Sequence, residues 1–567
     1  MNDQRNLILA FVLAFVVIFG WGAISNKFFP VANKPATQVV DGKTQVVPNP
    51  SAAPAPEGPT AVRARAAVLA GTPRVKIATP KLAGSINLRG ARIDDLVLVT
   101  QRETIAKNSP PIRLLSPEAT PGAYYAGFGW SGDGVALPGP DTVWTASGGD
   151  LTPDHPVTLS WTNGAGQSFA IRLAIDDGYM FAVTQSVANG GTAAVSVRPY
   201  ALIDRTGQSP DKSTWTAHTG PMGFFNNAAD YGVAFKDLDA NPQGQHFQTT
   251  GGWLGFGDKY WLTALVPDQG SAIDAAFRSG GGQRYQAEFT PAASIVPPGK
   301  AVSYGARLFA GAKEVTLLDR YKGEGIAGFD RAIDWGWFIW FEKPIFYLLD
   351  WLFRMCGNFG VAIILLTLIV RGLMFPIAQR QFKSMAAMRT LQPKMKALQE
   401  RHKDDKPRLQ QEMMKLYQEE KVNPIGGCLP IFLQIPIFYA LYKVLLLTID
   451  MRHQPFVLWI KDLSAPDPLT PVNLFGLLAF EPPAFLHLGV LAILLGITMY
   501  LQFRLNPQPM DEAQKQVFAM MPWVMMFVFA PFAAGLQLYY VMSNTLTILQ
   551  QRWLYSRNPV LKAAPAK

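Results

Sequence analysis

Cysteine is almost absent from this chain, which has 567 residues and only Cys356 and Cys428. Both lie in the C-terminal part, so the long middle region has no disulfide framework. Short catalytic patterns are missing as well: the sequence has no C-x-x-C, no H-E-x-x-H, no Walker-type phosphate loop, and no G-x-S-x-G between a strand and a helix. These absences give no support to redox, metalloprotease, nucleotide-dependent or serine-hydrolase chemistry.

Charged residues are scarce too, at 16% of the chain against 49% hydrophobic residues. This balance is typical of a membrane protein with a soluble portion, and the length suffices for two or more domains. The formal net charge is +10. In a membrane protein such an excess usually marks cytoplasmic loops, so we expect no specific nucleic-acid partner.

Acidic residues are missing from the apolar runs of membrane-spanning length, and one arginine lies deep within such a run. Arg371 lies within Gly357–Ile377, roughly 20 Å from one end of the helix that this run predicts. A guanidinium does not deprotonate, and placing it against lipid costs about 2.5–3.5 kcal/mol. The side chain either snorkels to the nearer interface or lies in a wet cavity that a ligand visits. The apolar run continues past Arg371, which favours the cavity.

The N-terminal region, residues 1–29, contains the apolar run Leu7–Ile24. It is either a signal peptide or a retained transmembrane anchor. No small-x-small cleavage pattern follows Trp21, so we favour the anchor. Residues 30–70 are rich in proline and alanine, which predicts an extended tether with no reason to pack.

The residue pattern changes over residues 71–325, where short segments of alternating apolar and polar residues are separated by turn signals. Regular strand spacing with Gly-rich turns predicts an all-β sandwich of two broad sheets. The clearest turns are at 163–164, 176–178 and 189–191. Four polar residues near these strands suit a sugar or metal site, but we interpret them as turn and cap residues: Asp154, His155, Asp176 and Asp177.

Residues 326–355 are aromatic and amphipathic, with Glu342, Lys343 and Pro344 in their middle. This pattern favours a helix in the plane of the membrane interface, and a helix packed on the β domain is the alternative. Residues 356–555 then contain five apolar runs, each near the length that crosses a bilayer: Gly357–Ile377, Pro424–Leu447, Pro483–Leu505, Val517–Ala533 and Ala534–Trp553. With the N-terminal anchor these runs predict six spans.

The distribution of basic residues predicts the topology. Residues 380–423 are dense in lysine and arginine, Arg504 and Lys515 flank the next short loop, and the tail 556–567 is mildly basic. These segments alternate correctly if both termini are cytoplasmic. The β domain then lies on the outer side of the membrane.

The basic segment 380–423 also has an apolar periodicity that predicts an antiparallel helical hairpin turning at residues 402–407. Pro393 should kink or interrupt the first arm. Methionine adapts to many apolar shapes, so these residues either contact a client or hold the two arms together; the seam comprises Met385, Met388, Leu391, Met395, Leu398, Leu409, Met413 and Leu416. A basic amphipathic stretch can also lie on anionic lipid.

Polar residues interrupt the spans, and Thr367 lies one turn before Arg371 on the same helix face. We interpret Ser543 and Asn544, together in the last span, as residues that hydrogen-bond helices to one another. Four others are interpreted as a wet groove around Arg371: Thr367, Gln434, Tyr539 and Tyr540.

The spans lack the groups that transport or catalysis would need. A transporter shows paired carboxylates or half-helix ion sites near the midplane, and an intramembrane enzyme needs a nucleophile with a base or a metal set. His487 stands alone at a helix start. We therefore predict no catalytic residues, no metal and no cofactor, and a cavity suited to transient binding of a polypeptide segment.

Several long motifs occur in an order that resembles the YidC family of membrane-protein insertases. They lie between about Asp330 and Tyr555 and read IVRGLMFP, QPKMKALQ, DDKPRLQQEMMKLYQEEKVNPIGGCLP, FLQIPIFYALY, WIKDLSAPDP, FAMMPWVMM and GLQLYYVMSN. The anchor, tether and β domain resemble the Gram-negative branch by architecture. The resemblance implies a five-helix core with a hydrophilic groove, a periplasmic β-supersandwich, and a location in the bacterial inner membrane.

The resemblance also implies roles and partners. The family's groove residues correspond to Arg371, Thr367 and Gln434, with its tyrosine pair at Tyr539 and Tyr540. Implied partners are the Sec translocon, ribosome–nascent chain complexes, nascent membrane proteins and membrane lipids. Two features depart from the family: Leu469–Phe485 looks like an insertion, and the tail is too short and mildly basic for a strong ribosome-docking element. Two other functions stay open, a periplasmic module that binds glycan or peptide above a membrane base, and a solute channel.

Overall fold

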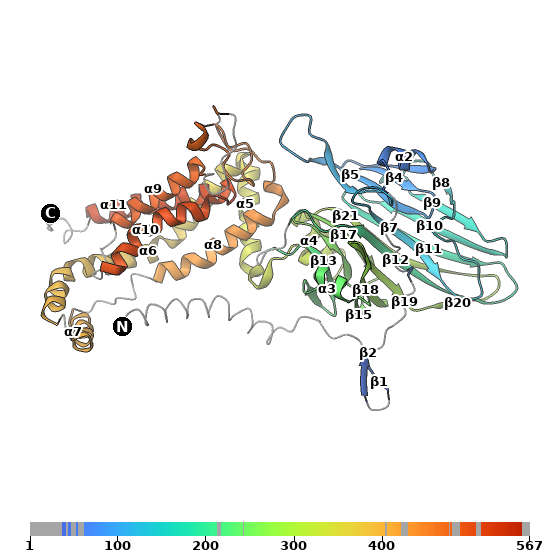
Figure 1. Ribbon diagram of the computed structural model, residues 1–567, viewed down its shortest axis with the longest axis horizontal. Helices are drawn as coiled ribbons and strands as arrows, with labels where there is room; N and C mark the ends of the chain where they lie inside the picture. Colours follow the sequence, from blue (N-terminus) through green and yellow to red (C-terminus); the bar gives the residue numbers. More distant parts are fainter. Residues whose placement is uncertain are drawn as a thin grey trace. The chain divides into compact units, whose positions relative to one another are not determined.

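A computed structural model describes most of the chain, and Figure 1 shows it coloured along the sequence. The described residues are 37–40, 43–46, 53–54, 62–211, 217–241, 243–402, 405–420, 429–475, 477–478, 488–505 and 512–557. The chain divides into two compact units, Met1–Asp334 and Trp335–Lys567. The first contains the strands and the second the long helices, as the sequence predicts.

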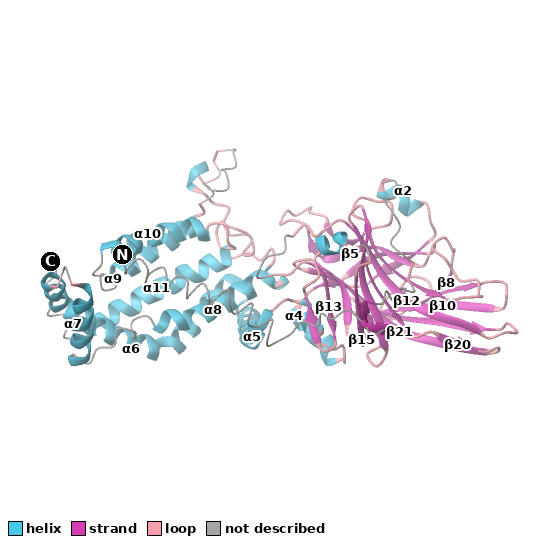
Figure 2. Cartoon of the chain, turned by 60° about the horizontal axis from the view of Figure 1, so that its bottom comes forward, coloured by secondary structure: helices cyan, strands magenta, loops and turns pink. Residues whose placement is uncertain are grey.

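The first unit contains two large antiparallel sheets, drawn in magenta in Figure 2. Among the residues that the structure describes, one sheet has nine strands, in the spatial order β14 (Ala228–Asp230), β13 (Gly220–Phe225), β16 (Trp253–Gly257), β17 (Trp261–Pro267), β21 (Lys300–Ala312), β11 (Met180–Asn189), β10 (Gln167–Ile175), β9 (Val157–Thr162) and β8 (Thr145–Ser147).

Within the same described ranges the other sheet has ten strands. Its main path runs β15 (Gln245–Thr250), β18 (Ala272–Gly281), β19 (Arg284–Pro291), β12 (Val195–Thr206), β7 (Tyr124–Ser131), β5 (Arg92–Arg102), β4 (Leu82–Asn87) and β3 (Arg74–Ala78). Off this path, β20 (Ser294–Val296) pairs with β12 and β6 (Pro111–Leu115) pairs with β5. Short helices α3 (Phe235–Ala240) and α4 (Val315–Gly323) complete the unit.

Alternating side chains explain how these strands form a sandwich. In β10, Phe169, Ile171 and Leu173 are buried while intervening residues are more exposed, because successive side chains point to opposite faces of a strand. The three turn signals connect β9 to β10, β10 to β11 and β11 to β12. The predicted two-sheet sandwich is therefore confirmed. Asp176 accepts from the backbone N–H groups of Gly178 and Met180, which is the turn role that the sequence indicated.

Two buried polar features distinguish the interior of the sandwich. Arg205 on β12 pairs with Asp258, which follows β16 of the other sheet, at 2.8 Å between Nη2 and Oδ1. Lys313, directly after β21, is 3% exposed. Burial lowers the pKa of Lys313 to about 8, although nearby Asp258, Asp334 and Asp211 oppose this shift.

The tether packs more than the sequence indicated. Its residues form a hairpin, β1 (Thr37–Val40) with β2 (Lys43–Val46), and a short helix, α2 (Arg65–Ala70). The carbonyl of Pro54 accepts from Gln286 Nε2 on β19 at 2.9 Å. The prediction of a wholly unpacked tether is thus wrong: an extended chain rich in proline leaves its carbonyls available, and buried sheet side chains bond one of them.

The second unit consists mainly of helices in the part of the chain that the structure describes. Its elements are η2 (Gly336–Phe338), α5 (Ile339–Cys356), α6 (Phe359–Arg401), α7 (Lys406–Glu419), α8 (Leu429–Leu447), η4 (Ile449–Met451), η5 (Pro471–Asn473), α9 (Val490–Leu505), α10 (Glu512–Phe529) and α11 (Ala534–Arg557). Figure 1 shows α5 running across one end of the other long helices. The unit boundary groups α5 with the other long helices, and its place at the membrane interface stays a prediction.

Helix α5 turns sharply into α6. Gly357 ends α5 with φ +68°, and the side chain of Asn358 accepts from the backbone N–H of Val361 to start α6. Helix α6 then continues without a break to Arg401, although it contains Pro376 and Pro393. Pro393 therefore does not interrupt the arm, because a proline removes one helical hydrogen bond and neighbouring turns continue the ladder, and the alternative of a kink stays a prediction.

The apolar helices lie where the sequence predicted spans. Within the described residues, one helical stretch, Phe359–Phe382, is long and apolar enough to cross a membrane. Three shorter apolar stretches are Gln434–Leu447, Val490–Leu505 and Gln516–Phe529. The predicted anchor Leu7–Ile24 lies outside the described residues, so the count of six spans stays a prediction.

Candidate functional site

Arg371 is held by a hydroxyl group on another helix. Its Nε donates to Oγ of Ser543 on α11 at 3.0 Å, and one terminal guanidinium nitrogen donates to the same oxygen. The side chain is half-buried. Among the described residues, no carboxylate oxygen lies within 4.0 Å of it. The positive charge of this guanidinium is therefore held by a neutral acceptor.

Thr367 lies one turn before Arg371 on α6 and is fully buried. Its hydroxyl donates to the carbonyl oxygen of Ile363 in the preceding turn at 2.6 Å. This back-bond fixes the hydroxyl in place and leaves its oxygen as an acceptor.

A second polar link joins α8 to α11. Nε2 of Gln434 donates to the hydroxyl oxygen of Tyr539 at 2.9 Å, and Tyr539 is only 1% exposed. Tyr539 and Ser543 are four residues apart, so they lie on the same face of α11. Helices α6 and α8 thus both bond to this face of α11. We call Arg371, Thr367, Gln434, Tyr539 and Ser543 the polar cluster.

Tyr540 is positioned by the contacts of its ring. The ring lies 4.9 Å from Phe438 of α8 and 4.7 Å from Phe529 of α10, measured between ring centroids. It also meets the ring of Tyr539 edge-on at 5.7 Å. Tyr540 therefore packs among aromatic rings, whereas the groove prediction grouped it with the polar residues.

Ser543 hydrogen-bonds α11 to α6, as the sequence indicated, but sequence reasoning did not identify Arg371 as its partner. The signal was the spacing of four residues from Tyr539, which puts both on one helix face. Asn544 fits its prediction, because its Nδ2 donates to Oγ1 of Thr498 on α9 at 3.3 Å. Gln537, fully buried, donates to carbonyl oxygens at the end of α10, which closes the turn from α10 to α11.

The predicted helical hairpin is formed by the end of α6 and by α7. Met395 is 5% exposed, with its Sδ 3.9 Å from the hydroxyl oxygen of Tyr417 on α7. Lys394 and Glu420 form an ion pair at 2.5 Å across the two arms. Met395 therefore packs between the arms, which is one of the two roles that the sequence left open, and its contact with a client stays a prediction.

The other methionines of the hairpin differ in how exposed their side chains are. Met413 is half-buried, and the neighbouring Met414, which the sequence analysis did not select, is 56% exposed. The side chains of Met385 and Met388 lie outside the described part of the chain. Met414 is thus the exposed thioether that the hairpin offers in the described ranges.

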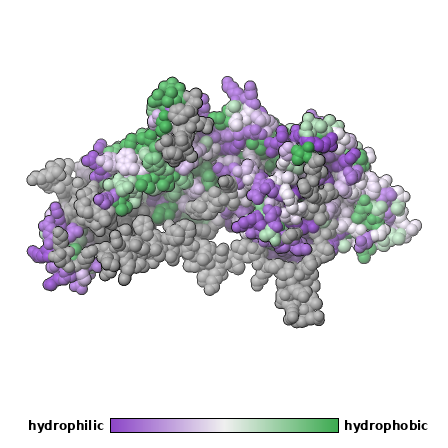
Figure 3. Space-filling view, viewed as in Figure 1, coloured by the Kyte–Doolittle hydropathy of each residue, from purple (hydrophilic) through white to green (hydrophobic). Residues whose placement is uncertain are grey.

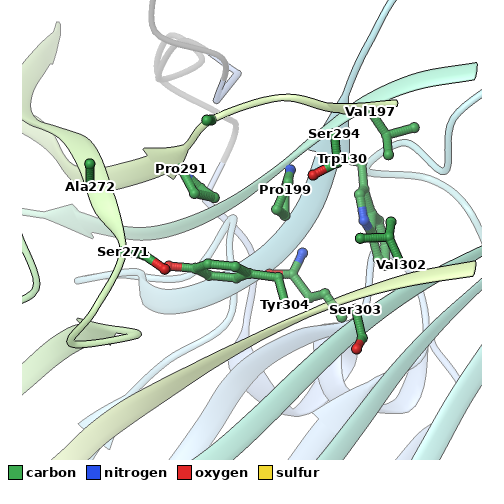
Figure 4. Close-up of a pocket in the computed structure, with 12 residues that line it drawn as sticks. Trp130, Val197, Pro199, Ser271, Ala272, Pro291, Ser294, Val302, Ser303 and Tyr304 are labelled. Carbon is green, nitrogen blue, oxygen red and sulfur yellow. The ribbon is translucent and has the colours of Figure 1, made fainter. Parts of the chain in front are cut away.

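The β-sandwich contains a pocket of about 280 Å³. Figure 4 shows Trp130, Val302 and Tyr304 among the side chains that surround it. The pocket lies between the two sheets, since Trp130 is on β7 and Tyr304 is on β21. Its lining among the described residues has no charged side chain, so it suits a neutral ligand.

The described residues contain no group of three or more histidine, cysteine, aspartate or glutamate side chains placed to hold a metal ion. What they do contain is a unit of apolar helices around a hydrogen-bonded cation, and a β-sandwich domain joined to it in sequence. These features together define a helical membrane protein with a β-sandwich domain.

Comparisons with known proteins agree with this class. Residues 74–348 match the YidC periplasmic domain, and residues 351–561 match the 60Kd inner membrane protein family. A membrane protein insertase YidC of Zymomonas mobilis is 50% identical over 98% of this chain and 96% of its own length. Its counterpart in Rhizobium meliloti is 44% identical over 99% and 97%. The chain therefore belongs to the YidC family of membrane protein insertases, and the resemblance seen in the sequence is confirmed.

Among solved structures, the chain is similar to an active YidC insertase in which the first transmembrane domain is resolved. The two are 18% identical, the alignment covers 95% of this chain and 98% of the other, and the TM-score is 0.37. Like its relatives, this chain has a periplasmic domain and belongs to the inner membrane.

Proposed function

We propose that this insertase receives the hydrophilic flank of a nascent membrane protein in a groove whose floor is the polar cluster. The observation that carries the proposal is the bond from Arg371 to Ser543 in place of a carboxylate. A hydroxyl fixes the guanidinium without neutralising it. In a setting of low dielectric constant, an acidic client residue then gains more from this charge than it would in water.

The mechanism requires no covalent step. The hairpin first contacts an emerging apolar segment through Met414 and its neighbours, since thioethers adapt to varied shapes. The groove then hydrates the polar flank and shortens the apolar path across the bilayer. Burial of the client's apolar segment in lipid finally drives its sideways release.

The proposed topology has six spans with both termini in the cytoplasm and the β domain in the periplasm. The proposed partners are nascent membrane proteins, ribosome–nascent chain complexes, the Sec translocon and membrane lipids. Support comes from the basic residues that flank the helices: Arg504 lies at the end of α9 and Arg557 at the end of α11. Basic residues favour the cytoplasmic side of a span.

Depletion of the chain from cells tests the proposal. Small inner-membrane proteins should then fail to insert, as measured by protease protection of their translocated ends. Crosslinkers at Thr367 and Tyr539 should capture stalled nascent chains, and a crosslinker at the exposed Ile295 of β20 serves as the control. Normal insertion after depletion would refute the proposal.

The uncharged pocket between the sheets favours a second candidate function, a periplasmic module that binds a neutral glycan or peptide. Deleting residues 72–311 separates the two candidates. Client insertion should largely survive if the helical unit does the work, and should vanish if the β domain does. A solute channel is a third candidate, and it predicts ion or solute flux through reconstituted protein without any client.

A further inference from the structure

The crossover between α8 and α9 is firmly attached to the helices that it joins. The carboxylate of Asp467 is 1% exposed and accepts from the indole N–H of Trp459 at 2.9 Å and from the backbone N–H of Leu491, in the first turn of α9, at 2.8 Å. The backbone N–H of Gly535, at the start of α11, donates to the carbonyl of Leu463 at 2.9 Å. The crossover therefore lies at the end of the unit where α9 and α11 begin.

A cluster of large apolar side chains projects from this crossover. We call it the apolar tip, and its members are Val472 (38% exposed), Leu474 (53%), Phe475 (54%), Leu477 (84%) and Leu478 (44%). From Leu469 to Phe480 the sequence has no charged residue. In Figure 3 the tip is strongly green, as are parts of the long helices. An exposed apolar group of this size marks a surface that something covers.

The backbone holds the tip in a fixed outward arrangement. Leu474 and Phe475 both adopt the left-handed region, with φ of +51° and +59°. The backbone N–H of Phe475 donates to the carbonyl of Thr470 at 2.9 Å, which closes the turn. Large non-glycine residues rarely adopt this conformation. The turn thus presents apolar side chains outward even though its conformation is unfavourable for them.

A second apolar projection lies in the same crossover. Val457 is 48% exposed and Leu458 is 82% exposed, and Leu458 also has a positive φ, of +56°. The backbone N–H of Phe456 donates to the carbonyl of Ile460 at 2.9 Å, so this turn is closed as well. Two separate turns of one crossover therefore expose aliphatic side chains.

We propose that the apolar tip and the Val457–Leu458 turn enter the periplasmic leaflet of the membrane and anchor this end of the helical unit among lipid acyl chains. The proposal rests on the topology given under Proposed function, which puts the crossover on the periplasmic side. It goes further by giving the exposed turns of the crossover a role and a partner.

The composition of both turns favours lipid over a protein partner. Protein-binding centres are enriched in tryptophan, tyrosine and arginine, whereas leucine and valine are under-represented among them. The exposed residues here are leucine, valine and one phenylalanine. They match the exposed residues of the helices next in sequence, such as Ile497 and Leu501 of α9 and Phe527 of α10, which face lipid in the proposed topology.

Fluorescence quenching in vesicles tests the proposal with the full-length chain. In a background with Cys356→Ser and Cys428→Ser, single cysteines at Leu477, Leu458, Leu501 and Ile295 are labelled with an environment-sensitive dye. The labelled chain is reconstituted into vesicles of phosphatidylethanolamine and phosphatidylglycerol. Lipids that carry a nitroxide quencher near the headgroup or near the chain end then report depth. Leu501 is the membrane reference, and Ile295, 73% exposed on β20, is the aqueous reference.

We expect dye at Leu477 and Leu458 to emit at shorter wavelength than dye at Ile295. Its quenching should be several-fold stronger by the nitroxide near the headgroup than by the one near the chain end. Water-like, unquenched emission at Leu477 with strong quenching at Leu501 would overturn this inference alone. Absent quenching at Leu501 would overturn the proposed topology itself. Short-wavelength emission at Leu477 that neither lipid nitroxide quenches, and that is lost on dilution of protein in lipid, would assign the tip to a second copy and would also overturn the inference.

Discussion

Arg371 of α6 and Ser543 of α11 are joined at 3.0 Å, across a sequence separation of 172 residues. The acceptor is a hydroxyl, so the bond orients the cation and leaves its charge uncompensated. Four residues earlier on the same face of α11, Tyr539 accepts from Gln434 of α8. One face of α11 therefore organises both polar links of the cluster, and each link can be broken separately.

Arg371→Lys should retain more insertion activity than Arg371→Leu. Lysine keeps the charge and loses the planar donor geometry, whereas leucine removes both. A pair of charges 4 Å apart is worth about 4 kcal/mol at an intermediate dielectric constant, and about 1.4 kcal/mol changes an equilibrium tenfold. We expect Arg371→Leu to reduce insertion of clients with acidic flanks by about tenfold or more. Protease protection of the translocated flank is the measurement.

The matched control changes the clients instead of the insertase. When the acidic flank residues of a client are replaced by asparagine and glutamine, the two variants should insert that client to similar extents. If Arg371→Lys and Arg371→Leu insert acidic-flank clients equally well, Arg371 has no electrostatic role.

Ser543→Ala should destabilise the helical unit by about 1.5–3 kcal/mol, because hydrogen bonds to charged groups contribute about that much. The loss should be absent when Arg371→Leu is already present, so a double-mutant cycle in thermal unfolding isolates the bond. Thr545→Ala is a suitable control, since its hydroxyl bonds the carbonyl of Val541 in its own helix. Equal losses on adding Ser543→Ala to the parent chain and to the Arg371→Leu variant would show that the contact contributes nothing.

Tyr539→Phe should cost more stability than the same change at Tyr540. The Tyr539 hydroxyl is the acceptor for Gln434, and its removal leaves a half-buried amide donor without that partner. Tyr540→Phe keeps the aromatic packing against Phe438 and Phe529. Adding Gln434→Leu to Tyr539→Phe should recover part of the loss, as thermal unfolding of the three variants will show. Additive losses would contradict the pairing.

The sequence was sufficient for the features that depend on local pattern. Alternation in strands such as β10 and glycine-containing turns such as Asn163–Gly164 predicted the sandwich, and apolar runs predicted the long helices. Arg371 was singled out because a charge in an apolar run is costly wherever it lies. Each of these features can be predicted from residues that are close together in the sequence.

The missed features depend on contacts between distant segments. Ser543 became a partner of Arg371 only when α6 packed on α11, and Met395 became buried only when α7 folded back on α6. The bond from Gln286 to Pro54 joins residues 232 positions apart. Periodicity states which face of a helix is apolar, but not which helix will cover it.

Substitutions of the exposed and the buried methionine of the hairpin should have different effects. Met414→Ser should reduce crosslinking of the hairpin to nascent chains and leave thermal stability nearly unchanged, because Met414 is 56% exposed. Met395→Ser should instead loosen the hairpin, because it removes a buried side chain from the contact with Tyr417. Hydrogen exchange of α7 amides measures the second effect. Faster exchange in the Met414 variant than in the Met395 variant would reverse the assignment.

Lys313 makes the stability of the β domain depend on pH in a direction opposite to that of a lysine whose pKa is raised by an ion pair. Burial lowers its pKa from 10.5 to about 8, so between these values the unfolded chain holds more protons than the folded chain. The free energy of unfolding must then rise with pH across this window, by about 3 kcal/mol at most. Below pH 8 both states are protonated, and the full cost of burying the charge remains.

Lys313→Met should therefore stabilise the β domain at pH 7 and flatten the rise in stability between pH 8 and 10.5. Methionine has a similar length and carries no charge, so packing around β21 is largely kept. Urea unfolding of the full chain, followed by hydrogen exchange of β17 and β21 amides, reports on this domain specifically. The exposed Lys76 of β3 provides the control, since Lys76→Met removes a lysine without removing a buried charge. If both variants have the same pH profile as the parent, Lys313 is not the group responsible.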